Sequence, residues 1–259
     1  MPTLSNILSF IDHSRAIVTV EGEDAGKFLQ GLISNDIHKA TSDSWLYALL
    51  LTAQGKISLD VFIQASEGGY LLDCPSEEVE QLIKRLNFYK LRSKVAISLA
   101  PGKIRLAKGS GFKDPRHADL WGRQVVSEDE HPNIDAQTQY HIERMQLLVP
   151  DFAMDLYPDK FFPHELGMNQ LNAIDYAKGC YVGQEVTARV EYRGQVRKKL
   201  HLVMLAEGSS YNKGEDIISD ELKVGIMLGH QDNFGLCQLR EGEFSSLITA
   251  SGASIEISK

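Results

Sequence analysis

The residues best suited to chemistry lie in one short run, KGCYVGQE, which starts at Lys178. Gly179 and Gly183 bracket a single cysteine, and glycine permits backbone conformations and close approaches that other residues resist. A helical turn that begins after Gly183 would aim its free amides toward Cys180, and Lys178 and Arg189 would add positive charge. Such surroundings favour the nucleophilic thiolate. The run therefore predicts a reactive cysteine, although a small buried residue beside a tight turn remains the alternative.

Other catalytic and metal-binding motifs are absent from the sequence. Cys74 and Cys237 form no Cys-x-x-Cys pair and, with Cys180, no disulfide framework. The eight histidines include no His-x-x-x-His pair and no Cys/His cluster, so no stable metal site is expected. Neither a Gly-x-x-x-x-Gly-Lys-Ser/Thr phosphate loop nor a Gly-x-Ser-x-Gly elbow occurs. Nucleotide hydrolysis and serine-esterase chemistry are therefore disfavoured.

Two basic stretches stand out in this acidic chain. The first consists of three arginines spaced four apart and two lysines: Arg189, Arg193, Arg197, Lys198 and Lys199. It could bind the carboxylates of a ligand, or it could be a solvated rim. The second runs from Lys84 to Lys94 and includes Arg85, Lys90 and Arg92. It could contact RNA or an acidic partner, or it could be a solvated helix face.

The elements that must position these residues form an α+β pattern in the first hundred residues. Alternating apolar runs predict strands, Gly-containing turns between them predict an antiparallel meander, and apolar stripes predict two helices. Glu23 and Asp24 open the first helix, and Ser76 is the candidate N-cap of the second. The expected order is strand, helix, three strands, helix and strand, at 16–20, 23–36, 45–52, 57–64, 70–74, 76–86 and 95–99.

The rest of the chain predicts a second, similar half and a β-module. Strand-like runs at 104–107 and 120–126 and a helix-like run at 136–148 repeat part of the first pattern. Beyond Arg197 the chain changes to short β-like runs, at 199–205, 217–219, 222–228, 235–239 and 254–257. We therefore expect an α+β fold with two antiparallel-sheet α+β halves, about 1–100 and 101–196, followed by a small C-terminal β-barrel at 197–259.

Composition restricts the class of protein. The chain has 259 residues, of which 43% are apolar and 24% charged, and its formal charge is −8. This charge argues against a general nucleic-acid binder or a polybasic membrane protein. The longest apolar runs fall far short of the ~18 residues that cross a bilayer. The N-terminal residues do not form a secretory signal, so we expect a soluble, cytoplasmic protein.

A family resemblance adds to these observations. The run KGCYVGQEVTAR resembles the signature of the YgfZ family, the folate-binding iron–sulfur cluster assembly factors related to the aminomethyltransferase of glycine cleavage, and especially its mitochondrial-type branch. Further segments are similar to the family's first helix, central hairpin and second half: DAGKFLQGLISNDI at 24–37, LLTAQGKISLDVFI at 50–63, FYKLRSKVAIS at 88–98, DPR at 114–116, WGR at 121–123, and Tyr140 with Arg144. The resemblance implies the aminomethyltransferase folate-binding fold.

The resemblance also implies a ligand and a cavity for it. Tetrahydrofolate, or a one-carbon derivative, would lie between the two α+β halves. A carboxylate would accept from the pterin, aromatic or apolar residues would form the walls, and basic residues would bind the glutamate tail. The expected contacts are Glu165, or in its place Glu185, with Gln184, Asp60, Tyr192, Arg189 and Arg193. Cys180 and Lys178 would carry the chemistry.

Two functions follow from the resemblance. In the first, the protein is an accessory factor that helps to assemble or repair iron–sulfur clusters in client enzymes, with cluster carriers or clients as partners. Cys180 would be a transient iron ligand, since one cysteine cannot hold a cluster alone. In the second, it is a folate-dependent one-carbon transferase in which Asp60 acts as base. Leu59 precedes Asp60 where the transferases have paired acids, which weakens the second reading. Some family members are also linked to tRNA modification.

Overall fold

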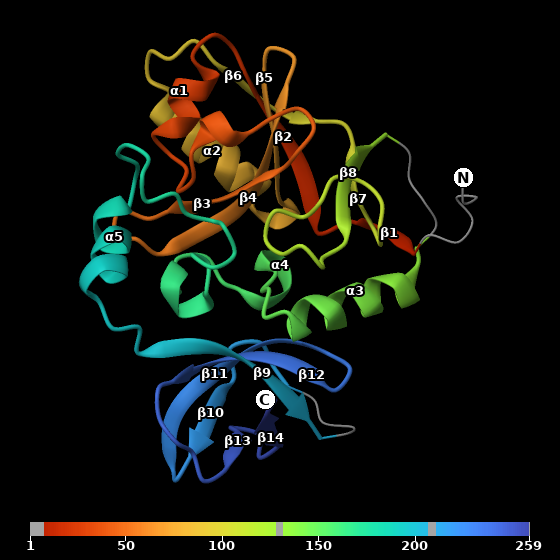
Figure 1. Ribbon diagram of the computed structural model, residues 1–259, viewed down its shortest axis with the longest axis vertical. Helices are drawn as coiled ribbons and strands as arrows, with labels where there is room; N and C mark the ends of the chain where they lie inside the picture. Colours follow the sequence, from red (N-terminus) through yellow and green to blue (C-terminus); the bar gives the residue numbers. More distant parts are fainter. Residues whose placement is uncertain (1–7, 128–131, 207–210, 259) are drawn as a thin grey trace.

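Two antiparallel sheets and a closed barrel make up the computed structural model (Figure 1). The structure describes residues 8–127, 132–206 and 211–258. In Figure 1 the two sheets lie in the upper part of the molecule, the barrel lies below them, and short helices separate the two regions. The predicted α+β fold with a C-terminal barrel is confirmed. No helix in the described ranges is long and apolar enough to span a membrane.

The larger sheet has five strands in the order β3-β4-β5-β2-β6. Its strands are β2 (Arg15–Glu21), β3 (Leu46–Leu51), β4 (Ile57–Ser66), β5 (Gly69–Pro75) and β6 (Ala96–Ala100). All six residues of β3 are buried, so this edge strand is covered on both faces. Helix α1 (Ala25–Gln30) packs against β5, and α2 (Val79–Lys90) packs against β2 and β6. The predicted meander is therefore present.

The smaller sheet joins strands that are distant in sequence. Strand β1 (Ser9–Asp12) pairs with β7 (Lys103–Ala107), which pairs with β8 (Gly122–Val126). Helix α3 (Ile134–Gln146) packs on β1, where Phe10, Trp121 and Tyr140 form an aromatic cluster. The proposed division of the α+β region at residue 100 stays a prediction, but this sheet takes its edge strand from the first twelve residues.

The barrel closes six strands in the order β10-β11-β12-β9-β14-β13. They are β9 (Lys198–Leu205), β10 (Asp216–Ser219), β11 (Leu222–Gln231), β12 (Phe234–Arg240), β13 (Leu247–Thr249) and β14 (Ser254–Ile257). Val203, Ile217 and Leu239 belong to its own core, whereas Ile226, Leu228 and Leu236 join the main core of the α+β region. The barrel thus packs on the α+β region, where β9, β11 and β12 contact α3, α4 (Phe152–Asp155) and the 3₁₀ turn η4 (Pro163–Leu166).

Three details differ from the sequence-based expectation. Strands β1 and β13 were not predicted, because they have four and three residues and their apolar patterns are too short to recognise. The first helix ends at Gln30 rather than near Asp36, because Ile33 lies beyond the helix and forms an isolated β-bridge with Leu50. Ser76 begins a 3₁₀ turn, η3 (Ser76–Glu78), and the α-helix starts three residues later.

Candidate functional site

Cys180 lies in an exposed loop that the fold holds in place on both sides. After the loop, Gly183 adopts φ 83° and caps helix α5 (Gln184–Arg193), as the sequence predicted. A Cβ at Gly183 would overlap the Thr52 carbonyl oxygen, so this close approach to the turn between β3 and β4 requires glycine. The Val182 N–H donates to the Gly31 carbonyl at 3.3 Å, at the end of α1. The thiol is therefore presented to solvent from an anchored loop.

Lys178 provides a second anchor for the loop. Its buried ammonium donates to the carbonyls of Gln30, Ile33 and Asn35 at 2.8, 2.6 and 2.8 Å. Burial lowers the pKa of Lys178 to about 8. All three donors of the ammonium are used by backbone oxygens that follow α1. The expected action of Lys178 beside the thiol stays a prediction, and in the structure its hydrogen bonds position the loop.

The other two cysteines are in different surroundings. Cys74 lies in β5 and Cys237 in β12, and both side chains are fully buried. Burial raises the pKa of Cys74 to about 12 and raises that of Cys237 further. Both thiols are therefore protonated and shielded near neutral pH. Cys180 is thus the cysteine that a reagent, a metal or a partner can reach.

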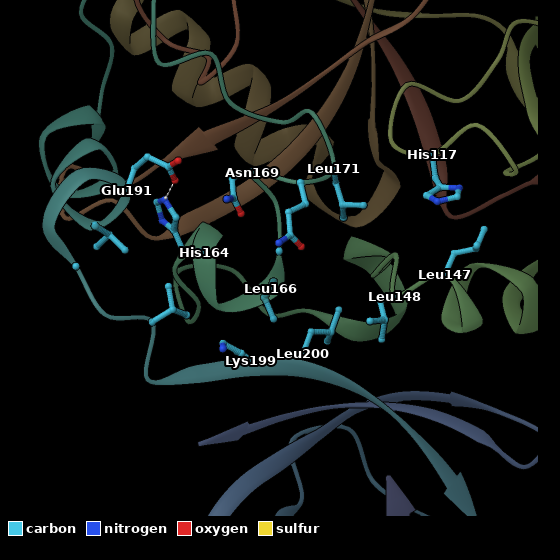
Figure 2. Close-up of a pocket in the computed structure, with 15 residues that line it drawn as sticks. His117, Leu147, Leu148, His164, Leu166, Asn169, Leu171, Glu191, Lys199 and Leu200 are labelled. Carbon is cyan, nitrogen blue, oxygen red and sulfur yellow. Dashed lines mark hydrogen bonds and ion pairs between the residues drawn. The ribbon is translucent and has the colours of Figure 1, made fainter. Parts of the chain in front are cut away.

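A cavity of about 460 Å³ lies where the α+β region meets the barrel (Figure 2). It is bounded by the 3₁₀ turn η4 (Pro163–Leu166) and the residues after it, the end of α3, the last turns of α5 and the start of β9. Five leucines and two valines form its apolar walls. Its polar residues are His117, His164, Asn169, Gln170, Glu191 and Lys199. An apolar slot with a few polar groups is typical of a site for a small organic ligand.

His164 and Glu191 join two walls of this cavity (Figure 2). His164 Nε2 lies 3.1 Å from a carboxylate oxygen of Glu191 and 2.9 Å from the hydroxyl of Tyr176. Because a carboxylate only accepts, Nε2 carries the proton and Nδ1 is an acceptor. Nδ1 is buried without a hydrogen-bond partner among the described residues. Burial lowers the pKa of His164 and the Glu191 contact opposes this, so the net direction is toward the neutral ring.

Of the seven residues expected to contact folate, the six whose side chains the structure describes do not line this cavity. Glu165 accepts from the Phe162 N–H and from Gln238 Nε2 at 3.1 and 3.2 Å, and it lines a separate cavity of about 400 Å³ against the barrel. On α5, Gln184 is half-buried, whereas Glu185, Arg189 and Tyr192 are exposed. Arg193 ends the helix, and its side chain lies outside the described part of the structure.

Asp60 lies in a buried ion network rather than at a cavity. Its carboxylate accepts from Arg15 at 2.7 Å and from the Tyr47 hydroxyl at 3.2 Å. Arg15 also donates to Asp73, which pairs with Arg123. The network continues through Arg116 and Asp114, so the DPR and WGR motifs supply its second half. The guanidinium groups of Arg15, Arg116 and Arg123 lie 5.2, 4.8 and 3.7 Å from the centre of the Phe62 ring.

Sequence reasoning found the cysteine loop but missed the residues of the cavity. His164 directly precedes the expected Glu165 in the sequence. Glu191 lies two residues after the expected Arg189 on the same helix. Helical spacing was the signal in the sequence that could have pointed to this side of α5. Val186, Thr187 and Val190 form the less exposed stripe of the helix, and Glu191 follows Val190. The side of the helix that faces the barrel could not be deduced without the barrel's position.

Metal binding by the chain alone is not supported by its side-chain arrangement. Among the described residues, no group of three or more His, Cys, Asp or Glu side chains is placed to hold a metal ion.

Comparison with known proteins identifies the class of protein from its fold. The crystal structure of the glycine cleavage system aminomethyltransferase T from Bartonella henselae matches with a TM-score of 0.74, over 97% of this chain and 84% of that chain, at 12% identity. The chain thus has the aminomethyltransferase fold. No family model matches the chain.

The sequence itself is similar to a more specific group. It is 30% identical to the mitochondrial iron–sulfur cluster assembly factor IBA57 of Mus musculus, over 87% of this chain and 75% of the mouse protein. It is 28% identical to the human protein of the same name over the same shares, and 31% identical to the Neurospora crassa homologue over 76% of this chain. The chain belongs to the IBA57 family of iron–sulfur cluster assembly factors, which confirms the resemblance to the mitochondrial-type branch of the YgfZ family.

Two qualifications of the sequence-based expectation come from the same relatives. The chain spans about half the length, 54%, of the Neurospora crassa and Pyricularia oryzae homologues. All of the relatives named above are called mitochondrial, so the expectation of a cytoplasmic protein was wrong. None of their names mentions tRNA modification.

Proposed function

We propose that this protein assists the assembly or repair of iron–sulfur clusters in client enzymes, with the Cys180 thiolate as a transient ligand to cluster iron. The observation that carries the proposal is the placement of Cys180. It is exposed, it lies in a loop fixed by Lys178 and Gly183, and the chain belongs to a family of cluster assembly factors. A rigid, accessible thiol can reach a cluster held on another protein.

The chemistry requires a partner. Clusters are held by about four ligands, and Cys180 has no companion among the described residues that would complete such a set. The cluster is therefore cargo that Cys180 shares with a cluster carrier or a client enzyme. A single thiolate ligand is easily replaced by another thiol, so the cluster can be transferred from Cys180 to the next protein.

The cavity at His164 is the place where tetrahydrofolate would bind. Its volume and apolar walls suit a pterin, and the unsatisfied His164 Nδ1 can accept from a ring N–H. The Glu191 carboxylate can accept from the amino edge, and Lys199 can bind a carboxylate of the glutamate tail. Gln184 and Glu191 are about 10 Å apart along α5, so the ligand and Cys180 would lie toward opposite ends of this helix.

The cysteine is tested by a rescue assay in cells that lack their own family member. Cys180→Ser is expected to restore less than a tenth of the activity of a cluster-dependent enzyme, because serine is a poor iron ligand. Cys74→Ala, expressed at an equal level, is the control for loss of a thiol elsewhere. In the purified protein, Cys180 is expected to be alkylated at least tenfold faster than the two buried cysteines. Full rescue by Cys180→Ser would refute the proposal.

The folate site is tested by thermal denaturation with added tetrahydrofolate. A hundredfold excess over the dissociation constant is expected to stabilise the protein by about 2.7 kcal/mol. Glu191→Gln and His164→Ala should weaken binding at least tenfold. Glu185→Gln, an exposed acid on the same helix, is the matched control and should leave binding unchanged. An unchanged melting curve together with no heat of binding would exclude folate from this cavity.

No observation on the described residues favours one-carbon transfer as the function. Asp60, its expected base, has a side chain that is 2% exposed and is already paired with Arg15. It cannot reach a substrate in the cavity at His164 without breaking the ion network that joins the two sheets.

A further inference from the structure

The C-terminal half of α2 has an apolar stripe that faces solvent. The inner side of the helix is apolar and buried, and its Leu82 and Leu86 are fully buried against the sheet. On the outer side, Phe88 is 76% exposed, and Leu91, three residues later, is 88% exposed. Single exposed apolar residues are common, but two large ones three positions apart at the end of a helix suggest a contact surface.

Leu91 also has an unfavourable backbone conformation. It ends α2 with φ 45° and ψ −108°, a region that glycine enters freely and leucine rarely adopts. A glycine here would stabilise the turn and would expose less apolar surface. The presence of leucine at such a position points to a role for its side chain outside the folded chain.

Unpaired cations surround this stripe. Lys84, Lys90 and Arg92, together with Lys27 of α1, form no ion pair with any described residue, although the whole chain carries a charge of −8. Nearby acids are already engaged, since Asp24 accepts from the Lys94 N–H and Glu23 pairs with the Lys94 ammonium. The surface is therefore locally basic. We call these four cations, with Phe88 and Leu91, the α2 surface.

A groove of about 740 Å³ completes this surface. It runs between α1 and the residues that follow α2, and its walls include Lys27, Phe28, Leu91 and Arg92. The remaining walls are Ser93 and Asp24, whose carboxylate already accepts from the Lys94 N–H. An acidic protein segment with apolar side chains would complement the two cations and the two apolar residues of the groove.

The α2 surface lies close to the cysteine loop. Helix α1 lines the groove with Lys27 and Phe28, and the backbone just beyond it accepts hydrogen bonds from the cysteine loop, at Gln30 and Gly31. A second link passes through Leu51, whose carbonyl accepts from Arg85 of α2 and whose side chain lies against Gly183. One α1 helix, about 9 Å long, thus spans the distance between the groove and the loop. A standard protein interface is wide enough to cover both the groove and the cysteine loop.

We infer that the α2 surface is the docking site for an acidic protein that shares the cluster with Cys180. This inference rests on the proposed function. A protein is favoured over RNA because the overall charge of −8 repels a polyanion. Charge complementarity would guide the approach, and Phe88 and Leu91 would anchor the bound partner.

The decisive variant is Leu91→Gly. It should have a melting temperature at or above that of the wild type, because glycine relieves the backbone strain, and yet it should lose at least tenfold in the cellular rescue assay. Arg92→Glu should show the same loss. Leu222→Ser and Arg240→Glu are matched controls on the barrel, since both residues are exposed. A purely structural role of Leu91 would lower stability and activity together, which would overturn the inference.

The outcome for the docking surface can be separated from that for the proposed function. If Cys180→Ser rescues fully, the proposed function fails. If Cys180→Ser is inactive while Leu91→Gly and Arg92→Glu rescue as well as wild type, the docking surface alone is refuted. A photo-crosslinking phenylalanine analogue in place of Phe88 identifies the occupant in cells. An adduct with an acidic iron–sulfur protein, lost in Arg92→Glu, supports the inference, and an adduct with RNA overturns it.

Discussion

At the scale of single residues, the structure assigns different roles to neighbours in the cysteine run. Cys180 faces solvent, whereas Lys178, two positions earlier, is buried and bonded to three backbone carbonyls. An ammonium at the end of a helix also interacts favourably with the carbonyl dipoles there. The precision with which Cys180 is presented therefore depends on Lys178.

Replacement of this lysine tests its role as an anchor. Lys178→Met keeps most of the side-chain length but leaves three carbonyls without their donor, so the free energy of unfolding should fall by about 1–3 kcal/mol. Alkylation of Cys180 should change in rate, because its loop loses an attachment. Lys39→Met is the control, since Lys39 has an exposed side chain and pairs with Asp175, three residues before Lys178. Equal stability of the two variants would contradict the anchoring role.

At the same scale, the sequence could identify the exposed cysteine but not the residues of the cavity. Cys180 is recognisable because its glycines and their spacing are local features of the chain. His164 and Glu191 become neighbours only when η4 packs against α5, and they are 27 positions apart. Glu165 was a reasonable choice by residue type, but the 3₁₀ turn directs its carboxylate to its own backbone and to the barrel.

At the scale of elements, the buried ion network joins the two sheets. Asp60 and Asp73 come from the large sheet, Arg123 comes from β8 of the small one, and Phe62 lies among the three guanidinium groups. Buried ion pairs add little net stability compared with apolar residues of the same size, but loss of one partner leaves an uncompensated charge. The network therefore fixes how the sheets meet, and each member depends on the others.

The variant Asp60→Asn separates this role from catalysis. Since Arg15 would lose one of its two carboxylate partners, the free energy of unfolding should fall by about 3–5 kcal/mol in chemical denaturation. Asp119→Asn, at an exposed position shortly before β8, should change the free energy of unfolding by less than about 0.5 kcal/mol. A stable Asp60→Asn protein that has lost folate-dependent activity would instead revive the transferase.

Element prediction succeeded where the pattern was long and local. The strands of the meander alternate or are wholly apolar and are separated by glycine turns, so their periodicity is clear. Strand β1 has four residues, and its partner lies almost a hundred positions away, so no local signal marks it. The ion network was equally hidden, because isolated Asp and Arg residues are usually solvated.

At the scale of the whole molecule, buried charges also lie beneath the barrel. Arg144 of α3 pairs with Asp155 at 2.6 Å, and its Nε donates to His141 Nδ1 at 3.0 Å. Gly229 of β11 packs so closely on Asp155 that a Cβ there would overlap the carboxylate. Burial, with Arg144 nearby, lowers the pKa of His141 to about 4. The hydrogen bond from Arg144 thus requires an unprotonated Nδ1, so His141 is neutral in the folded protein.

This requirement makes stability depend on pH. The unfolded chain binds a proton at His141 below about pH 6.5, whereas the folded chain does not until about pH 4. Because the unfolded state binds more protons in this window, stability should fall by up to about 3 kcal/mol as the pH drops from 6.5 to 4. Urea denaturation at several pH values measures it. His141→Gln should flatten the curve and the exposed His230→Gln should not, and parallel curves for all three proteins would contradict the assignment.

The pairing of β1 with β7 has a consequence for how the chain acquires its structure during synthesis. Ser9 leaves the ribosome first, but its partner Ala107 is made almost a hundred residues later. At ordinary rates of translation this is a delay of roughly 5–20 s. During that time the apolar Phe10 and Ile11 have no sheet to join, and long-range pairing of this kind also slows folding. Strand β1 therefore waits for a partner while most of the α+β region is made, and chaperones can bind its apolar residues during this time.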